Sequence, residues 1–208
     1  MNFDHILVIV MSLVSLVFAI VLHEVAHGYA AYRMGDPTAA YSKRLTLNPL
    51  AHVDLFGSII LPLILVFTSP VVLGWAKPVP INPYHFRNLK KGIMIVGAAG
   101  PLTNFALALL SGLLCLVVPM SFDVVKVFLV IFCVTNANLA VFNMIPIPPL
   151  DGSRVLYGLL PRGMDDQLMG LEKYGIFIIF GLLYIGALDR IIIPVSEFVK
   201  GLLLGGHY

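Results

Sequence analysis

The chain begins with an apolar run that carries no formal charge over residues 6–22 and is long enough to cross a lipid bilayer. A bilayer has a hydrocarbon core about 30 Å thick, and about 20 helical residues are needed to cross it. The run continues as far as Met34, after which Gly35 and Pro37 favour a stop. We therefore predict a membrane-spanning helix over about residues 3–34.

A metal-binding pattern lies inside this first run. His23-Glu24-Val25-Ala26-His27 is an H-E-x-x-H sequence. Histidines four residues apart are separated by about 40° around a helix, so His23 and His27 can face one metal ion. Glu24 follows the first histidine, where its carboxylate can deprotonate a metal-activated water. The alternative is a chance match with two hydrogen-bonded core imidazoles, but ionisable groups in membrane spans are rare and usually functional.

The composition is typical of a membrane protein. Apolar residues make up 59% of the chain and charged residues 12%, which is about half the charged fraction of soluble domains. The net charge of +2 and the absence of any long Lys/Arg run do not indicate a nucleic-acid partner. Cys115 and Cys133 lie in apolar stretches, so they predict neither a zinc ribbon nor a disulfide framework.

Further apolar runs predict additional spans. They cover residues 55–75, 92–118, about 124–144 and about 174–188, with a last piece at 191–204 that is either a sixth span or an interfacial helix. We predict an all-α polytopic membrane protein with about five to six transmembrane helices and short extended or re-entrant segments. Residues 1–208 form one membrane-embedded domain, with a core over about 1–155 and C-terminal helices over about 171–204.

A proline-rich segment follows the second apolar run. The X-Pro steps over residues 75–84 forbid a regular helix and favour extended backbone. Extended backbone of this kind can pair with a second strand by strand addition.

A second broken segment, residues 146–152, contains three prolines and ends in Asp151-Gly152. Catalytic zinc needs three protein ligands and leaves its fourth position to water. Asp151 is the best candidate for the third ligand because it is ionisable and directly follows an apolar span. It is also a suitable N-cap for a helix that starts near Gly152, and the two interpretations are about equal on these residues alone.

These motifs together resemble a known family. His23–Gly28 and Asn143–Gly152 resemble the paired signatures of the site-2 protease family, and Gly97–Asn104 resembles its G-P-x-x-N element. Residues 47–54 and 74–80 are similar to those of its short subgroup, which lacks PDZ and CBS domains. The resemblance covers the chain from the first span to about Gly152, and the order and spacing of the motifs make it specific.

The resemblance implies an intramembrane zinc metalloprotease that holds one Zn²⁺ per chain through His23, His27 and Asp151. Glu24 would be the general base, and the substrate would be a transmembrane protein in a prokaryotic cell membrane. A substrate helix must be unwound before its carbonyls can be attacked, and the released backbone groups then need partners. We expect these partners to come by strand addition from a clamp formed by Lys77, Pro78, Val79 and Pro80. The alternative is a catalytically inactive relative or a metal-binding transporter. Ionisable residues spread over several spans would favour a transporter, whereas here they gather at the ends of the first and fourth spans.

Several other polar residues have open roles. Asn138 or Asn143 could stabilise a tetrahedral oxyanion, hold the substrate, or form helix–helix hydrogen bonds. Asn104 is expected to pack or to support the site. His52 and Asp54 are interpreted as an ordinary loop pair or a brace rather than as a metal site.

Overall fold

The computed structural model describes residues 3–54, 57, 60, 76–119, 123–161, 163–164, 168, 170–187, 190, 193–195, 197–198 and 201. All regular elements within these residues are helical, which confirms the predicted all-α class. They are α1 (Phe3–Met34), α2 (Thr38–Tyr41), η1 (Pro49–His52), η3 (Pro83–His85), α4 (Leu89–Val117), α5 (Asp123–Asn143), α6 (Asp151–Leu159), η4 (Glu172–Tyr174) and α8 (Gly175–Tyr184).

Three of the described helices, α1, α4 and α5, are long and apolar enough to cross a membrane. Their bounds lie within three residues of the spans predicted at 3–34, 92–118 and 124–144. The first helix ends where expected, because Gly35 adopts a φ of 111° that disfavours side chains with a Cβ. The Gly35 N–H donates to Tyr32 O and the Asp36 N–H to Ala31 O, which satisfies carbonyls at the helix end.

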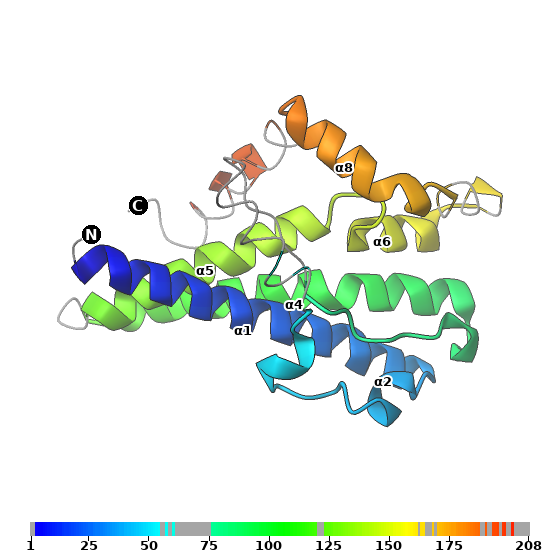
Figure 1. Cartoon of the computed structure of the whole chain (residues 1–208), viewed down its shortest axis with the longest axis horizontal. Helices are drawn as coiled ribbons and strands as arrows, with labels where there is room; N and C mark the ends of the chain where they lie inside the picture. Colours follow the sequence, from blue (N-terminus) through cyan, green and yellow to red (C-terminus); the bar gives the residue numbers. More distant parts are fainter. Residues whose placement is uncertain are drawn as a thin grey trace.

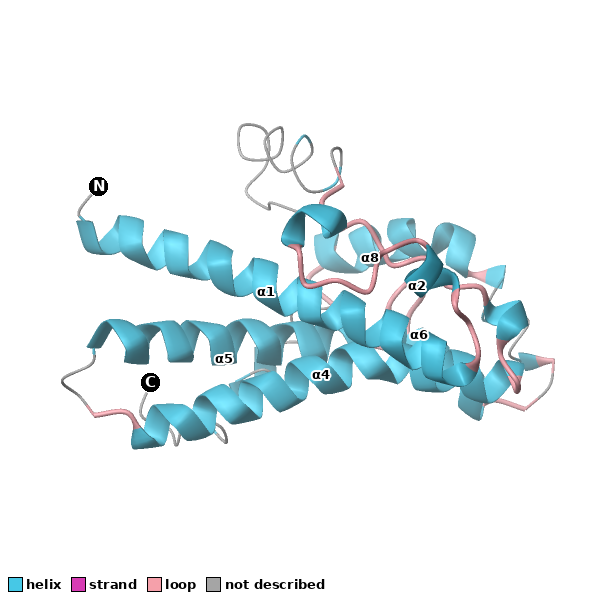
Figure 2. Cartoon of the chain, turned by 90° about the horizontal axis from the view of Figure 1, so that it is seen from below, coloured by secondary structure: helices cyan, strands magenta, loops and turns pink. Residues whose placement is uncertain are grey.

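The three long helices lie side by side, with α4 running opposite to α1 and α5 (Figures 1 and 2). Helix α4 also contacts α6, so it is the central element of the bundle. The buried positions between these helices are mostly small residues, such as Ala19 on α1, Ala108 on α4 and Ala137 on α5. Small residues let helices approach closely where the hydrophobic effect cannot drive association, as in a bilayer.

The outer faces of the long helices are strongly apolar. Val10 and Leu13 on α1 are 50% and 58% exposed, and Leu110 and Leu116 on α4 are 56% and 66% exposed. So many exposed large apolar side chains on neighbouring helices are unfavourable in water but suit contact with lipid hydrocarbon. The helix interiors satisfy their own backbone hydrogen bonds, as a lipid environment requires. The chain is therefore a membrane protein.

The last described helix is shorter than the predicted fifth span. A fifth span was expected over about 174–188, but α8 covers only Gly175–Tyr184 and a turn with a positive φ at Gly186 follows. Ten helical residues are about 15 Å long, which is half of a hydrocarbon core. The predicted span at 55–75 and the apolar piece at 191–204 lie mostly outside the described part of the chain, which includes only residues 57, 60, 193–195, 197–198 and 201 of them.

Candidate metal centre

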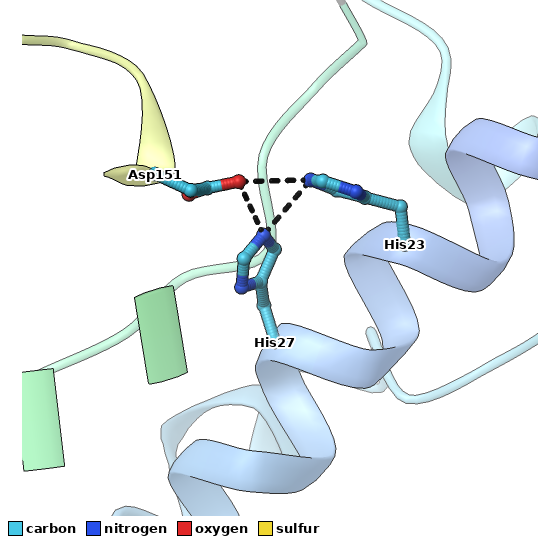
Figure 3. A group of neighbouring side chains, drawn as sticks. All are labelled: His23, His27 and Asp151. Atoms are coloured by element: carbon cyan, nitrogen blue, oxygen red, sulfur yellow. Dashed lines mark hydrogen bonds and ion pairs between the residues drawn. The ribbon is translucent and has the colours of Figure 1, made fainter. Parts of the chain in front are cut away.

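Two histidines and one aspartate converge in the bundle. His23 and His27 project from one face of α1, and Asp151 reaches them from the first turn of α6 (Figure 3). The His23 Nε2 and His27 Nε2 atoms are 2.9 Å apart, and each lies 3.1 Å from Asp151 Oδ2. All three residues are buried, with exposed fractions of 8%, 4% and 6%. The structure thus brings together the three predicted ligands, although Asp151 lies 124 residues after His27 in the sequence.

Hydrogen bonds at the far side of each ring determine the tautomers. The His27 Nδ1 lies 2.6 Å from the Val96 carbonyl oxygen, and the His23 Nδ1 lies 2.5 Å from Asn104 Oδ1. A carbonyl oxygen can only accept, so both neutral rings carry their proton on Nδ1. Both Nε2 lone pairs therefore point at Asp151, which is the arrangement that metal-binding histidines require.

This arrangement fits a divalent metal. When both rings are neutral, two lone pairs and a carboxylate oxygen converge on one point, and a divalent cation placed there relieves their mutual repulsion. Ligand atoms about 2.0–2.2 Å from one tetrahedral ion lie roughly 3.3–3.5 Å apart, a few tenths of an ångström more than the separations here. A metal ion also needs space between its ligands, and Gly100 on α4 provides this space. A Cβ at Gly100 would lie 2.5 Å from His23 Cε1 and 2.6 Å from His23 Nε2.

Glu24 lies beside the cluster in a cavity of about 470 Å³. The three converging residues and Glu24 line this cavity, as do Pro78, Val79, Ile81 and Asn143. The Val79 N–H donates to Glu24 Oε2 over 2.8 Å. A residue from the proline-rich segment thus contacts the carboxylate that the H-E-x-x-H pattern assigns to proton transfer.

The proline-rich segment is held in place along its backbone. It forms no helix over residues 76–82, in agreement with the prediction, while Trp75 lies outside the described residues. The last two residues of the predicted extended segment, 83 and 84, instead begin the short 3-10 helix η3, because Pro83 suits a first helical position and the Asn82 side chain accepts from the Tyr84 N–H. The Lys77 N–H donates to the His52 carbonyl, and Arg44 Nη2 donates to the carbonyls of Lys77 and Pro78. The Asn82 N–H donates to Asp36 Oδ2 over 2.6 Å. Of the four residues expected to form a clamp, Pro78 and Val79 line the cavity and Lys77 and Pro80 do not.

Asp36 anchors one end of this segment just beyond α1. Its fully buried carboxylate accepts hydrogen bonds from the Thr38 N–H and hydroxyl, the Asn82 N–H and the His85 ring, whose Nδ1 is 2.9 Å away. Burial alone would raise the pKa of Asp36, but these hydrogen bonds outweigh burial and lower the pKa from its ordinary value. The charged carboxylate therefore stabilises the connection between α1 and the proline-rich segment.

Asp151 does not act as an N-cap. Helix α6 begins at Asp151 itself, and its N-cap is Leu150, which makes no side-chain capping bond. The Asp151 carboxylate instead points at the histidines, while Arg154 Nη1 lies 3.5 Å from its other oxygen. Because Arg154 also lies 4.0 Å from Glu172, it connects the start of α6 to the segment before α8.

The asparagines separate into two groups. Asn143 lines the cavity, with one amide N–H donated to Leu139 O over 3.0 Å, whereas Asn138 is exposed and is not among the cavity-lining residues. Asn104 and Asn136 are fully buried and hydrogen-bonded to each other behind His23.

His52 is a brace, one of the two roles expected for it. Its ring Nε2–H donates to Thr46 O over 2.9 Å, and its own carbonyl accepts from Lys77. Its partner in the prediction, Asp54, accepts a hydrogen bond from the Gly57 N–H. Neither residue belongs to the group of ligand atoms that converges around His23.

Three contributors to the site were missed from the sequence. Asn136 shares its helical face with the small residues Cys133, Ala137 and Ala140, and that pattern could have identified it as buried. Asp36 directly follows the Gly35 stop of α1, where a carboxylate next to an extended segment suggests an anchor. Arg154 has no comparable signal, because its position depends on how α6 packs.

Comparisons with known proteins agree with this geometry. The family description Peptidase family M50 matches residues 119–185. YwhC of Bacillus subtilis, named as a candidate zinc metalloprotease, is 36% identical over 189 residues, which cover 86% of this chain and 82% of the relative. Rip2 of Mycolicibacterium smegmatis, named in the same way, is 28% identical over 184 residues, covering 88% and 70%. A zinc metalloprotease of Methanocaldococcus jannaschii is 27% identical over 191 residues, covering 87% of this chain and 44% of its own length. No solved structure is significantly similar.

Proposed function

Because the chain belongs to peptidase family M50, the site-2 protease family of zinc metalloproteases, we propose that it cleaves membrane proteins at a site within the bilayer. The zinc ligands in this proposal are His23, His27 and Asp151. The observation that carries it is the convergence of these three buried side chains, two of them on a membrane-spanning helix. Helix α1 is about 48 Å long, and the histidines lie about two-thirds to three-quarters of the way along it, within or at the edge of a core about 30 Å thick.

Glu24 is the general base of the proposed reaction. Zinc, when bound, supplies a Lewis acid that lowers the pKa of water and polarises a peptide carbonyl. Glu24 accepts a proton from the attacking water as the water oxygen bonds to the carbonyl carbon. Glu24 then delivers the proton to the departing amine nitrogen as the C–N bond breaks, so that the carboxylate is regenerated. The bond from the Val79 N–H orients this carboxylate in the cavity.

The proline-rich segment is the proposed substrate clamp. Among the described residues, nothing donates to the Val79 and Pro80 carbonyls, and the Ile81 N–H has no acceptor. These groups lie next to the cavity, which Val79 and Ile81 line. An unwound substrate strand could pair with them and so recover the backbone hydrogen bonds it loses when its helix opens. Gly28 on α1 allows the proline-rich segment to lie this close to the helix, because a Cβ at Gly28 would lie 2.9 Å from Val79 Cγ1.

Asn143 is the proposed oxyanion donor. It lines the cavity and uses one amide N–H on the Leu139 carbonyl, which leaves the second N–H for a substrate oxygen. The competing role is helix stabilisation alone, because an asparagine that bonds back to residue i−4 needs no substrate to explain it. Measuring peptide cleavage separately from zinc binding distinguishes these two roles.

The central experiment compares the wild-type protein with Glu24→Gln. The glutamine carbonyl can still accept the Val79 N–H, so the site keeps its geometry while it loses its proton acceptor. We expect normal zinc content and a loss of about 10²–10⁴-fold in cleavage of a single-span model substrate. A matched control, His23→Gln, should lose zinc as well as activity. Cleavage by Glu24→Gln at the wild-type rate would contradict the assignment of the base.

The clamp is tested separately with Ile81→Pro. This change removes the unpaired N–H, and Ile81→Val is the control that keeps it. We expect the proline variant to bind zinc normally but to cleave the membrane substrate more slowly. Equal cleavage by the two variants would show that strand addition at residue 81 is not part of the reaction.

A further inference from the structure

A chain of hydrogen bonds crosses three helices behind the metal centre. It starts at His23 Nδ1 on α1, passes through Asn104 on α4 and Asn136 on α5, and ends at the Phe132 carbonyl. The successive distances are 2.5, 2.8 and 2.9 Å. Both asparagines have an exposed fraction of 0%, so water does not compete for their bonds.

Counting donors and acceptors determines how the Asn104 amide is turned. Its Nδ2 has two hydrogens, which go to Asn136 Oδ1 over 2.8 Å and to the Ala19 carbonyl over 3.2 Å. A flipped amide would place its oxygen against these two acceptors and lose both bonds. The Asn104 oxygen must therefore face His23, and it can only accept. The proton on the ring consequently resides on Nδ1.

The orientation of Asn136 is determined in the same way. Its Nδ2 donates to the Phe132 carbonyl of its own helix, which leaves Oδ1 to accept from Asn104. All three bonds donate in one direction, from the ring toward the α5 backbone, and such aligned bonds polarise and strengthen one another. The tautomer of His23 is thus linked through two amides to the main chain of α5. His27, by contrast, donates directly to the Val96 carbonyl.

We propose that Asn136 is a positioning residue that acts through Asn104 to hold His23 in the Nδ1–H tautomer, with its Nε2 lone pair directed into the metal centre. This inference rests on the proposed zinc site. A positioning role for Asn136 can be distinguished by experiment from a role in helix packing alone. A packing role predicts that losing Asn136 lowers stability alone, whereas a positioning role predicts a specific loss of zinc affinity.

The first test measures zinc affinity of the full chain in detergent by competition with a chelator. Asn104→Leu should weaken binding by about 10–100-fold, and Asn136→Leu by a smaller factor of at least about threefold. Asn136→Asp should restore wild-type affinity, because a carboxyl group buried so deeply stays protonated and can donate to Phe132 while it accepts from Asn104. Cys133→Ala removes packing from the same face of α5 without touching the chain of amides, so it should leave affinity unchanged.

The second test needs neither zinc nor activity. Nitrogen-15 NMR of histidine-labelled metal-free protein reports which ring nitrogen of His23 is protonated, with His23→Gln used to assign the signal. At alkaline pH, where the imidazole ring is neutral, we expect the Nδ1–H form in the wild type and in Asn136→Asp, and a mixture of tautomers in Asn136→Leu. If Asn136→Leu does not fold, Asn136→Ser takes its place, because a serine hydroxyl is too short to bridge Asn104 and Phe132.

The outcomes separate this inference from the proposed function. Unchanged tautomer and zinc affinity in Asn136→Leu, with a stability loss like that of Cys133→Ala, would overturn the positioning role. A wild-type protein that binds no zinc would overturn the proposed metal site, while the tautomer measurement would still test the chain of amides.

Discussion

Replacing Gly100 with alanine tests the metal centre most sharply, because helix propensity predicts that the change stabilises the protein, whereas the steric surroundings of Gly100 predict that it disturbs the site. In the interior of a helix with free space, Gly→Ala stabilises by about 0.5–1 kcal/mol. Gly100 has no such space. The added Cβ would lie 2.5 Å from His23 Cε1 and 2.6 Å from His23 Nε2, with His27 Nε2 closer still.

The size of the disturbance follows from these distances. Real Cβ contacts essentially never fall below 3.0 Å, so the imidazole of His23 must retreat by about 0.5 Å. Metal–ligand bonds hold to about 0.2 Å of their ideal lengths, so this displacement is larger than a zinc site tolerates. The methyl group would also occupy the space between the rings. We expect Gly100→Ala to weaken zinc binding by at least about 100-fold, the upper end of the effect of losing a supporting hydrogen bond.

The assay is zinc affinity by chelator competition, together with the thermal midpoint of the metal-free protein in detergent. Gly181→Ala on α8 is the matched control, because nothing lies within 4 Å of its added Cβ and it is a helical glycine outside the cavity. The control should bind zinc as the wild type does and be at least as stable. A Gly100→Ala variant with wild-type zinc affinity and increased stability would refute the proposed position of the metal.

Three further changes probe other parts of the site. Val79→Pro removes the N–H that contacts Glu24, so cleavage should fall by about 10–100-fold at unchanged zinc content, while Val79→Ile should cleave normally. Asn143→Leu should lower the cleavage rate by about 10²–10³-fold without altering zinc affinity, and unchanged cleavage would leave Asn143 a helix-stabilising role only. Asp36→Asn should lower the thermal midpoint at pH 7. Because the pKa of Asp36 is lowered on folding, its charge stabilises above the ordinary value of 3.8, so the difference from the wild type should disappear as pH falls well below that value. A difference that persisted at low pH would contradict this origin.

The sequence alone determined the features that depend on local chemistry. Long uncharged runs must be helical in a bilayer, because only a helix satisfies its backbone there without outside partners, and the bounds of α1, α4 and α5 lie within three residues of the predicted ones. The spacing of His23 and His27 is a property of one helix, so their shared face followed from the helical repeat. The prolines of residues 76–82 excluded a helix for the same local reason.

Other features were decided only by tertiary structure, because they depend on which groups meet across helices. From the sequence, Asp151 suited an N-cap and a metal ligand equally well. The packing of α6 on α4 decides between them, because it places the Asp151 carboxylate 3.1 Å from the Nε2 atoms of His23 and His27. The small residues around Asn136 on α5 already favour its burial, but only the tertiary structure shows that its amide meets Asn104 of α4, while Asn138, two residues on, is exposed. The same holds for Gly100, whose missing side chain matters because α4 packs against the histidine face of α1. Local chemistry supplied two ligands and their spacing, and the packing of α1, α4, α5 and α6 around them supplied the third ligand, the space and the tautomers.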